Sequence, residues 1–330
     1  MSDVSCSLPH AHSEQCHFQI AWTINPHMVP GSSDLEIAFT QHLNFKQLLR
    51  DAGAEVVELP FVCSAYDSVF TKDNALLLSS AGPASSVKPG ASQLAVLANP
   101  LHGVRRAEQA GRKKALLSRG FSVVELPPQF KLEGGDLVVC AGHGIFMGHG
   151  FRSTLESAHA LEVRIGVSVL PLKLVDPFLY HLDTALSVLK DGTAIACKRA
   201  FAPKSWELLV RSPWISKVIE VSEREALSFG CNLVQVGKTV ILGSFLPGLM
   251  RSLKLQGYTP RYAPLSEFQR AGGSAACLVA EVHDHEALRS HAAGERSHAT
   301  RESGLAGHTE TLGLVTTSPT AARRSTSEYA

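Results

Sequence analysis

The stretch Leu137–Leu172, LVVCAGHGIFMGHGFRSTLESAHALEVRIGVSVLPL, contains the unit that decides the fold. Gly142 lies between two short apolar runs, which is the pattern of a β-hairpin, and Gly166 separates a helix-like run from a third apolar run. A glycine at that second place suits the left-handed end of a helix. The stretch therefore predicts a hairpin, a helix and a third strand, over Leu137–Val139 with Ile145–Gly148, Thr154–Ile165 and Val167–Leu172.

The rest of the chain repeats parts of this unit. Pairs of a helix and a strand are expected at Leu35–Ala52 with Ala54–Leu59, Arg106–Arg119 with Phe121–Leu126, and, more loosely, Trp206–Val210 with Val218–Val221. Further strands are expected at Ala75–Leu78, Ala185–Leu189 with Thr193–Cys197, Leu233–Val236 with Thr239–Leu242, and Leu278–Val282. Repetition at about 50 residues predicts a propeller-like or arrayed α/β fold. An open, doubly wound α/β sheet is the alternative, and the hairpins favour the first interpretation.

Composition divides the chain into three parts. Residues 1–15 and 285–330 carry few large apolar side chains, so neither segment can bury enough surface to offset the entropy lost when a chain becomes ordered. Both segments are expected to be disordered. Residues 16–284 are expected to form a single domain.

The charge balance and the cysteines narrow the classes of partner and site. The 330 residues include 31 Lys plus Arg and 30 Asp plus Glu, a balance that calls for neither nucleic acid nor an anionic membrane. The N-terminus lacks a secretory pattern, and no apolar run approaches the roughly 18 residues of a membrane helix, so a cytoplasmic protein is expected. Seven widely spaced cysteines without a CxxC pair argue against a disulfide framework and against a zinc cage.

Two segments place carboxylates beside expected strands. Asp67 and Asp73 precede the strand Ala75–Leu78, where a carboxylate could accept the fixed fork of donors on a planar guanidinium. The alternative is a pair of turn or capping aspartates. In Leu132-Glu-Gly-Gly-Asp136, two glycines permit a close backbone approach beside Glu133, although a plain loop leading into a strand would show the same pattern.

A histidine and a cysteine supply the candidate reactive groups. His181 and Asp183 are expected on one face of a strand, where an imidazole beside a carboxylate can act as a general acid or base. A buried structural histidine is the alternative. The glycine-rich stretch 272–277 brings Cys277 to the start of a strand and can offer backbone N–H groups to a thiolate. Cys231 also follows a glycine and begins a strand, and composition does not separate the two thiols.

Three arginines lie at expected helix starts: Arg105, Arg106 and Arg152. An arginine at such a place could bind a substrate carboxylate through two parallel hydrogen bonds. For either segment taken alone, an ordinary surface arginine is the simpler interpretation.

Taken together and in this order, the motifs resemble the guanidine-modifying (pentein) superfamily. That superfamily includes arginine deiminases, dimethylarginine dimethylaminohydrolases, amidinotransferases and arginine dihydrolase-like enzymes. The resemblance runs from Ile24-Asn-Pro-His-Met28 to Val282 and rests on four motifs, Phe70-Thr-Lys-Asp73, Leu132-Glu-Gly-Gly-Asp136, His181-Leu-Asp-Thr184 and Gly272-Gly-x3-Cys277. It implies an α/β propeller of five ββαβ modules with pseudo-five-fold symmetry around a central active site.

The resemblance also implies roles for individual residues. Cys277 matches the nucleophile, His181 the catalytic acid or base, and Glu133 the carboxylate that grips the guanidinium or steadies that histidine. Substrate-binding positions fall on Asp73, Asp183, Asp67, Arg152, Arg105, Arg106 and Asn25. The implied partner is a small guanidino substrate, with neither a metal nor a cofactor, and a homodimer is an allowed assembly.

The implied reaction begins when the Cys277 thiolate attacks the guanidinium carbon. His181 protonates the departing amine, and water then releases a ureido product such as citrulline from a covalent amidino-cysteine intermediate. In the alternative, an amidinotransferase, an amine acceptor replaces the water. Lys72 and Asp183 depart from the dimethylarginine hydrolase pattern, which has an acid and a lysine there. Asp73 departs from the dihydrolase-like group, which typically has an asparagine.

Overall fold

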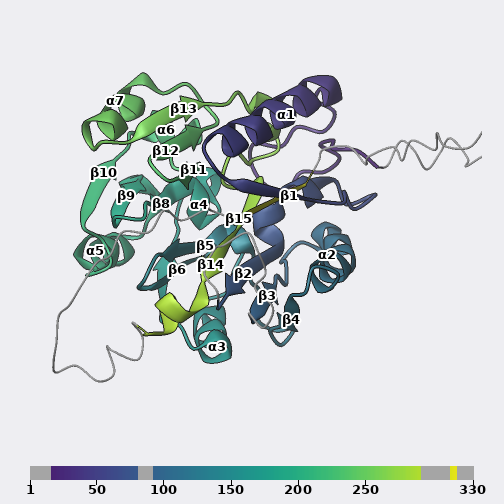
Figure 1. The fold of residues 1–330 in the computed structure, drawn as a ribbon, viewed down its shortest axis with the longest axis horizontal. Helices are drawn as coiled ribbons and strands as arrows, with labels where there is room; N and C mark the ends of the chain where they lie inside the picture. The colour runs from purple at the N-terminus through teal and green to yellow at the C-terminus, as the bar shows by residue number, and fades with distance from the viewer. Residues whose placement is uncertain (1–15, 81–91, 291–312, 318–330) are drawn as a thin grey trace, which may run out of the picture.

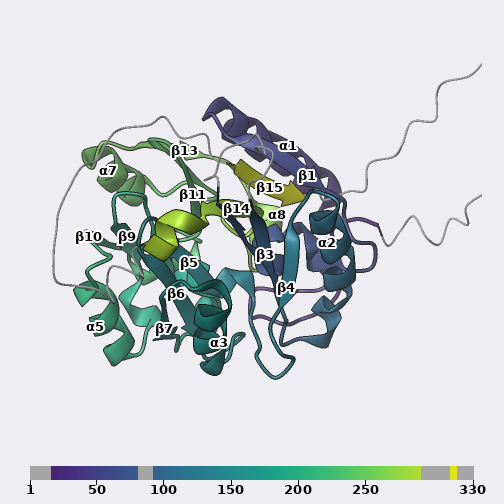
Figure 2. The same cartoon turned by 60° about the horizontal axis from the view of Figure 1, so that its bottom comes forward.

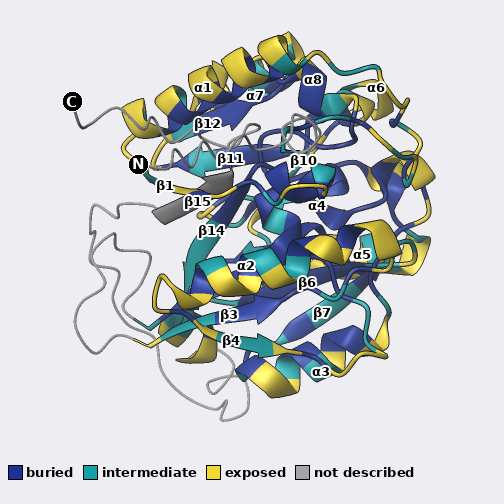
Figure 3. Cartoon of the chain, turned by 90° about the vertical axis from the view of Figure 1, so that its right-hand side faces the viewer, coloured by how far each residue is buried: buried dark blue, intermediate teal, exposed yellow. Residues whose placement is uncertain are grey.

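The computed structural model describes residues 16–80, 92–290 and 313–317. Short sheets occupy the interior, and helices cover them on the outside (Figure 1). Figure 3 shows the same division in the burial of the chain, because the strands are mostly dark blue and the outward faces of the helices are yellow. The predicted α/β class is confirmed.

Four consecutive stretches of the chain repeat a hairpin, a helix and a third strand, and we call each stretch a unit. The first unit consists of β2 (Ala75–Ser79), β3 (Gln93–Leu97), α2 (Ala107–Leu117) and β4 (Ser122–Glu125), and the second of β5 (Leu137–Cys140), β6 (Gly144–His149), α3 (Glu156–Ile165) and β7 (Val169–Lys173). The third unit consists of β8 (Leu186–Val188), β9 (Thr193–Ala196), α5 (Pro203–Arg211) and β10 (Lys217–Glu220), and the fourth of β11 (Leu233–Val236), β12 (Thr239–Leu242), α7 (Pro247–Leu255) and β13 (Thr259–Tyr262). In each unit the first two strands pair antiparallel, and the second strand pairs parallel with the third. Connections between units carry the short helices α4 (Leu182–Ala185), α6 (Glu223–Leu227) and α8 (Ser266–Gln269).

A fifth unit is assembled from the two ends of the chain. The helix α1 (Leu35–Asp51) and the strand β1 (Glu55–Leu59) come from the N-terminal side, whereas β14 (Val279–Asp284) and β15 (Gly313–Thr317) come from the C-terminal side. The strand β15 pairs antiparallel with β14 and parallel with β1, as the second strand of every other unit pairs with its neighbours. Figures 1 and 2 show β15 lying between β1 and β14. Since β14 also pairs with β2, the first and fifth units share one sheet.

The pairing of the described strands excludes one of the two predicted architectures. These strands form one six-stranded sheet and three three-stranded sheets, so the alternative of a single doubly wound sheet is wrong. The predicted turn at Gly142 and the predicted helix end at Gly166 are confirmed, with φ of 72° and 68°. Glycine adopts this left-handed conformation without a steric penalty.

The C-terminal segment differs from the expectation of disorder from residue 285 onward. Residues 285–290 are helical, and Leu288 is buried in an apolar cluster with Leu161 and Ile165 of α3. The strand β15 is a second ordered piece of this segment. Residues 285–290 pack on α3, and β15 pairs with β1 and β14. Composition does not predict these contacts, because the contacting residues lie far away in the sequence. Residues 1–15, 291–312 and 318–330 lie outside the described residues.

The cysteines require a further correction. Cys16 and Cys63 form a disulfide, which ties the start of the described chain to the loop after β1. The number and spacing of the cysteines did not predict this disulfide, because the two residues are 47 positions apart and meet only in the folded chain. The other described cysteines are free and buried: Cys140, Cys197, Cys231 and Cys277. Within the described ranges, no helix combines the length and the apolar character needed to cross a membrane.

A cavity of about 120 Å³ lies where the five units meet. Its walls come from the first strand of each unit, namely β2, β5, β8, β11 and β14. Lys72, Gly134, Asp183 and Ala276 also line it, and each of them lies just before one of these strands. The first strands of the five units, which we call the inner strands, therefore begin at the same end of this cavity.

Candidate active site

The chemically active residues lie immediately before the inner strands of the five units. Each unit contributes at least one buried polar or sulfur-bearing side chain within three positions of its first strand, namely Asp73, Asp136, Asp183, Asn232 and Cys277. Because the five strand starts converge, residues that are up to about 200 positions apart in the sequence meet in one cluster. Three further members of this cluster, Glu133, His181 and Arg105, are also buried.

Cys277 lies in the turn between Ser274 and β14, as the glycine-rich loop predicts. Its Sγ accepts a hydrogen bond from Asn232 Nδ2 at 3.1 Å and can donate to Asp183 Oδ2 at 3.4 Å. Burial raises the pKa of the thiol well above its ordinary value, and the carboxylates of Asp183 and Asp73 raise it further. The thiol is therefore protonated at neutral pH.

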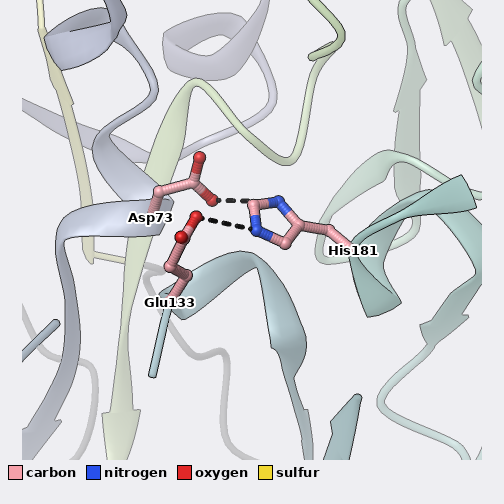
Figure 4. Close-up of side chains that lie close together, drawn as sticks. All are labelled: Asp73, Glu133 and His181. Carbon is pink, nitrogen blue, oxygen red and sulfur yellow. Dashed lines mark hydrogen bonds and ion pairs between the residues drawn. The ribbon is translucent and has the colours of Figure 1, made fainter. Parts of the chain in front are cut away.

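His181 lies between two carboxylates, toward which its imidazole ring points (Figure 4). Its Nε2 is 3.0 Å from Glu133 Oε2, and its Nδ1 is 3.6 Å from Asp73 Oδ1. Burial lowers the pKa of His181, but the charge of Asp73 and the hydrogen bond with Glu133 outweigh burial and raise that pKa to about 9. The imidazole is therefore positively charged at neutral pH and can act as a proton donor.

The local backbone at His181 differs from the prediction. His181 caps the N-terminus of the short helix α4 in an extended conformation, so the expected strand over His181 and Asp183 is wrong. Asp183 lies inside α4, and the strand β8 begins only at Leu186. Both side chains still reach the same cluster, because the helix N-terminus itself lies against Asp136, whose Oδ1 accepts a hydrogen bond from the backbone N–H of Leu182 at 3.1 Å.

Glu133 is the most heavily bonded acid of the cluster. Its Oε2 lies 3.0 Å from Arg152 Nη1 as well as from the imidazole, and its Oε1 accepts from the backbone N–H of Leu101 at 3.2 Å. Burial would raise the pKa of Glu133, but His181, Arg152 and Arg105 outweigh burial and hold the pKa well below its usual range. Glu133 therefore stays ionised and keeps the imidazole charged and fixed in place.

Arg105 is fully engaged with acids of the protein. Its Nη1 donates to Asp73 Oδ2 at 2.6 Å, and its Nε and Nη2 donate to the two oxygens of Glu108 at 2.7 and 2.9 Å. Nη2 also reaches the backbone carbonyl of Asp67 at 3.3 Å. The Asp67 carboxylate itself accepts from Trp22 Nε1, and burial raises the pKa of Asp67 to about 6 against the charge of Arg105.

The remaining predicted binding residues divide into two groups. Arg152 stacks over the ring of Tyr180 at 4.6 Å and lies in the loop after β6, before α3 rather than at its first turn. Asn25 donates to Tyr180 Oη at 3.3 Å and to the carbonyl of Ala271 at 3.1 Å, so both residues lie beside the cluster. Arg106 is exposed at the N-terminal end of α2 and is not brought to the cluster, so its expected place there is wrong. The chain can bury only one of two successive helix-start arginines, and Arg105 takes that place.

Two carboxylate oxygens beside Cys277 have no hydrogen-bond donor within the described chain, namely Asp73 Oδ1 and Asp183 Oδ1. Burial raises the pKa of Asp183 to about 6, although the charges of Lys72 and His181 act in the opposite direction. A buried acceptor without a donor costs free energy of roughly 1–3 kcal/mol. Such acceptors indicate a place where a ligand supplies N–H or O–H groups.

A small cavity of about 10 Å³ lies beside these groups. Ile24, Asn25 and Met28 of the N-terminal segment line it together with Phe70, Asp73 and Cys277. Apolar walls with a few convergent polar groups are typical of small-molecule sites. The cavity is much smaller than the roughly 300–1,000 Å³ of sites for drug-sized ligands.

Asp73, Glu133 and His181 also meet the spacing of a metal site, since their ligand atoms lie within 4.8 Å of one another. However, Asp73 Oδ2 and Glu133 Oε2 already accept from Arg105 and Arg152, whose positive charges oppose a bound cation. The sequence-based expectation of a site without a metal stays a prediction.

Sequence reasoning missed two members of the cluster, Asn232 and Asp136. Asp136 is fully buried and accepts hydrogen bonds from the backbone N–H groups of Ser153 and Leu182. Burial raises its pKa to about 7 against the charge of His181. Asn232 directly precedes β11 and holds Cys277. One signal could have found both, because each is the polar residue just before the first strand of its unit.

Comparison with known proteins agrees with this arrangement. Residues 27–284 match a family model described as N,N dimethylarginine dimethylhydrolase, eukaryotic. The N(G),N(G)-dimethylarginine dimethylaminohydrolase of Mycobacterium tuberculosis is 33% identical over 271 residues, covering 81% of this chain and 83% of the relative. The bifunctional arginine dihydrolase/ornithine cyclodeaminase AgrE of Nostoc sp. is 32% identical over 271 residues, covering 81% of this chain and 36% of the relative. This chain thus spans about a third of the length of that bifunctional relative and of its Synechocystis counterpart ArgZ.

Solved structures lead to the same family. The N-terminal domain of cyanobacterial ArgZ, as a cysteine-to-serine mutant bound to substrate, has a TM-score of 0.72 at 30% identity and covers 79% of this chain and 93% of that one. A dimethylarginine dimethylaminohydrolase adduct with 4-chloro-2-hydroxymethylpyridine has a TM-score of 0.60 at 21% identity, covering 75% of this chain and 91% of that one, and shows a likeness of fold. The chain belongs to the dimethylarginine dimethylaminohydrolase family, within the pentein superfamily.

Proposed function

We propose that this protein is a cysteine-dependent hydrolase that breaks a C–N bond of a guanidino substrate, with Cys277 as the nucleophile. The observation that carries the proposal is the pair of buried carboxylate oxygens without donors in the described chain, Asp73 Oδ1 and Asp183 Oδ1, which belong to the same cluster as the sulfur. A guanidinium is planar, positively charged and rich in N–H donors, so it satisfies both oxygens at once. The M. tuberculosis relative is named for hydrolysis of dimethylarginine and the Nostoc relative for arginine dihydrolase action, which supports a substrate of this class.

The charge of the substrate activates the nucleophile. Asp183 and Asp73 raise the pKa of the Cys277 thiol, and a guanidinium placed between them offsets both charges. The thiol proton passes to Asp183 Oδ2, which already lies 3.4 Å from Sγ. The resulting thiolate attacks the guanidinium carbon, forming a C–S bond and a tetrahedral adduct.

His181 then serves first as an acid and afterwards as a base. The charged imidazole donates its proton to the departing nitrogen, the C–N bond breaks, and ammonia or an amine leaves. Water next gives a proton to the neutral imidazole and attacks the same carbon. Collapse of this second adduct breaks the C–S bond, its hydroxyl proton is lost to solvent, and a neutral ureido product leaves. Asp183 then returns its proton to the thiolate. Glu133 keeps the imidazole oriented through both steps.

We further propose that the substrate is arginine or a methylated arginine, with citrulline as the product of a single hydrolysis. Asp73 has an asparagine counterpart in the dihydrolase-like group, so one step is favoured over two. The same proposal includes a five-module propeller around this site and a homodimer. It also includes binding roles for four residues, namely Asp67, Arg105, Arg152 and Asn25. The repeated pairing of the five described units around one cavity supports the propeller.

The test incubates the purified protein with arginine, monomethylarginine and asymmetric dimethylarginine, and measures citrulline together with the released amine. The expected result is citrulline from at least one of the three. Glycine and lysine are added in parallel, because transfer of an amidino group to either would indicate a transferase. A folded protein that forms no ureido product from any guanidine would contradict the proposal.

A further inference from the structure

We infer that Asn232 is a positioning residue for the nucleophile, and that its side-chain amide holds and stabilises the sulfur of Cys277. The inference rests on the proposed function for its catalytic meaning. Its structural basis is independent of any substrate. No sequence motif points to Asn232, and it is the contribution of the fourth unit to a cluster in which the other four units supply acids, the histidine or the cysteine.

The amide of Asn232 bonds both segments that form the reaction centre. Its Nδ2 donates to Cys277 Sγ at 3.1 Å and to the backbone carbonyl of Asp183 at 3.1 Å. Its Oδ1 accepts from the backbone N–H of Ala276 at 2.9 Å and from that of Cys277 at 3.3 Å. Asn232 is fully buried, and one amide therefore fixes the sulfur, the backbone that carries it and the helix that carries Asp183.

The surroundings of the sulfur explain why a donor is needed there. Asp183 Oδ2 lies 3.4 Å from Sγ, so in the protein without substrate a thiolate that has lost its proton to solvent would face a carboxylate. Asp183 and Asp73 both raise the pKa of the thiol, whereas hydrogen bonds from Asn232 and from the backbone of Ser274 lower it. A neutral amide donor stabilises a thiolate without adding a positive charge, which would compete with a cationic substrate.

The backbone before Asn232 shows how this side chain is aimed. Phe229 adopts a left-handed conformation with φ of 61°, which is uncommon for a bulky residue. Such a conformation persists only when its surroundings hold it, and here the Phe229 ring packs on His27 at 5.1 Å and the Phe229 carbonyl accepts from the N–H of Asn232 at 3.0 Å. The turn places Cys231 in the apolar core and Asn232 against Cys277.

A purely structural role would use only the bonds of Asn232 to the backbone. The variant Asn232→Asp keeps an acceptor for the N–H groups of Ala276 and Cys277, but it loses the donor to the sulfur and to the Asp183 carbonyl and places an acid beside the sulfur. The pKa of the thiol therefore reports the contact with the sulfur, and the folding of the variant reports the lost backbone bond. The matched control is Asn99→Asp. The Asn99 amide bonds the backbone carbonyls of Pro128 and Phe130, so this control makes the same chemical change at a site that does not touch the sulfur.

The decisive measurement is the rate at which iodoacetamide alkylates Cys277 as a function of pH, without substrate, followed by peptide mass spectrometry of the folded protein. In Asn232→Asp, the pH at which alkylation rises is expected to move up by about one unit or more, and kcat is expected to fall at least about 30-fold with a smaller change in KM. Asn99→Asp is expected to keep the wild-type profile.

An unchanged alkylation profile in Asn232→Asp would overturn the inference, even if activity were lost, because that result indicates a structural role alone. The outcome also separates this inference from the proposed function. If wild-type protein turns over no guanidine but the profile still shifts in Asn232→Asp, the proposed reaction fails and the role of Asn232 in holding the sulfur stands.

Discussion

Cys231 and Cys277 occupy similar stretches of sequence and very different surroundings. Each lies two positions before the first strand of a unit, and each is buried; Cys231 directly follows Gly230, whereas Cys277 follows the glycine-rich stretch 272–274. Cys231 packs in the apolar cluster that includes Ala185, Leu186 and Cys197. Cys277 Sγ instead lies within hydrogen-bond distance of Asn232 and Asp183.

The two thiols differ because the residue that reaches the cluster lies one position before the first strand in the fourth unit and two positions before it in the fifth unit. In the fourth unit, the residue that reaches the cluster is Asn232, directly before β11, so its neighbour Cys231 points away. In the fifth unit, the turn between Ser274 and β14 brings Cys277 itself to the cluster. Burial raises the pKa of both thiols, so burial alone does not mark the nucleophile. What marks it is the set of partners that the other units supply.

The largest difference in kcat is expected between the serine variants of these two cysteines. Cys277→Ser is expected to lower kcat by at least about 10⁴-fold, because the nucleophile is lost. Cys231→Ser is expected to leave kcat within about threefold, since a serine there only adds a polar group to the core, with some loss of stability. Steady-state assays on both variants check this, and the reverse pattern would refute the assignment of the nucleophile.

Removing the proton donor should have the next largest effect. His181→Ala is expected to lower kcat about 1,000-fold, because general acid–base catalysis typically contributes 10²–10⁴-fold. Single-turnover kinetics would locate the loss in the breaking of the C–N bond or in the hydrolysis of the adduct. Activity within tenfold of wild type would mean that another group transfers the proton.

Neutralising one acid beside the sulfur tests what distinguishes the surroundings of Cys277 from those of Cys231. Asp183→Asn keeps the shape of the side chain but removes a charge that the substrate cation pairs with, so kcat/KM is expected to fall roughly 100-fold. The same change removes a carboxylate that raises the pKa of Cys277, so alkylation of the thiol should begin at lower pH. An unchanged alkylation profile would show that Asp183 does not act on the sulfur.

The smallest predicted effect concerns stability against pH. The folded-state pKa of His181, about 9, lies above the ordinary value of 6.5, so the stabilisation is complete below about pH 6.5 and is lost as pH rises through 9. Between pH 6.5 and 8.5 the free energy of unfolding should fall by about 2 kcal/mol from this residue. Urea titrations of wild type and His181→Asn measure it, and the variant should lose this part of the slope. Equal slopes would contradict the charged imidazole.

Sequence reasoning found most of the fold and part of the site for identifiable reasons. Hairpins and glycine-ended helices are local signals, so the units around Gly142 and Gly166 could be predicted. The partnership of β15 with β1, and the disulfide between Cys16 and Cys63, depend on contacts between chain ends and distant loops, which no local pattern encodes.

The same limit applies to the site. Asp73, Glu133, His181 and Cys277 stand in motifs with recognisable chemistry, and they converge. Asn232 carries no motif, and its role depends on which residue before a strand faces the centre, which is set by the strained turn at Phe229. The prediction for Arg106 was wrong because the sequence does not show which of the two adjacent arginines, Arg105 or Arg106, is buried.

The most direct test of the account is mass spectrometry of the protein quenched during turnover of arginine. The account predicts an adduct on the peptide that contains Cys277, with the mass of the substrate less the departed ammonia, and an unmodified peptide containing Cys231. An adduct on Cys231, or rapid turnover with Cys277 always unmodified under conditions that slow the hydrolysis of the adduct, would contradict covalent catalysis by Cys277.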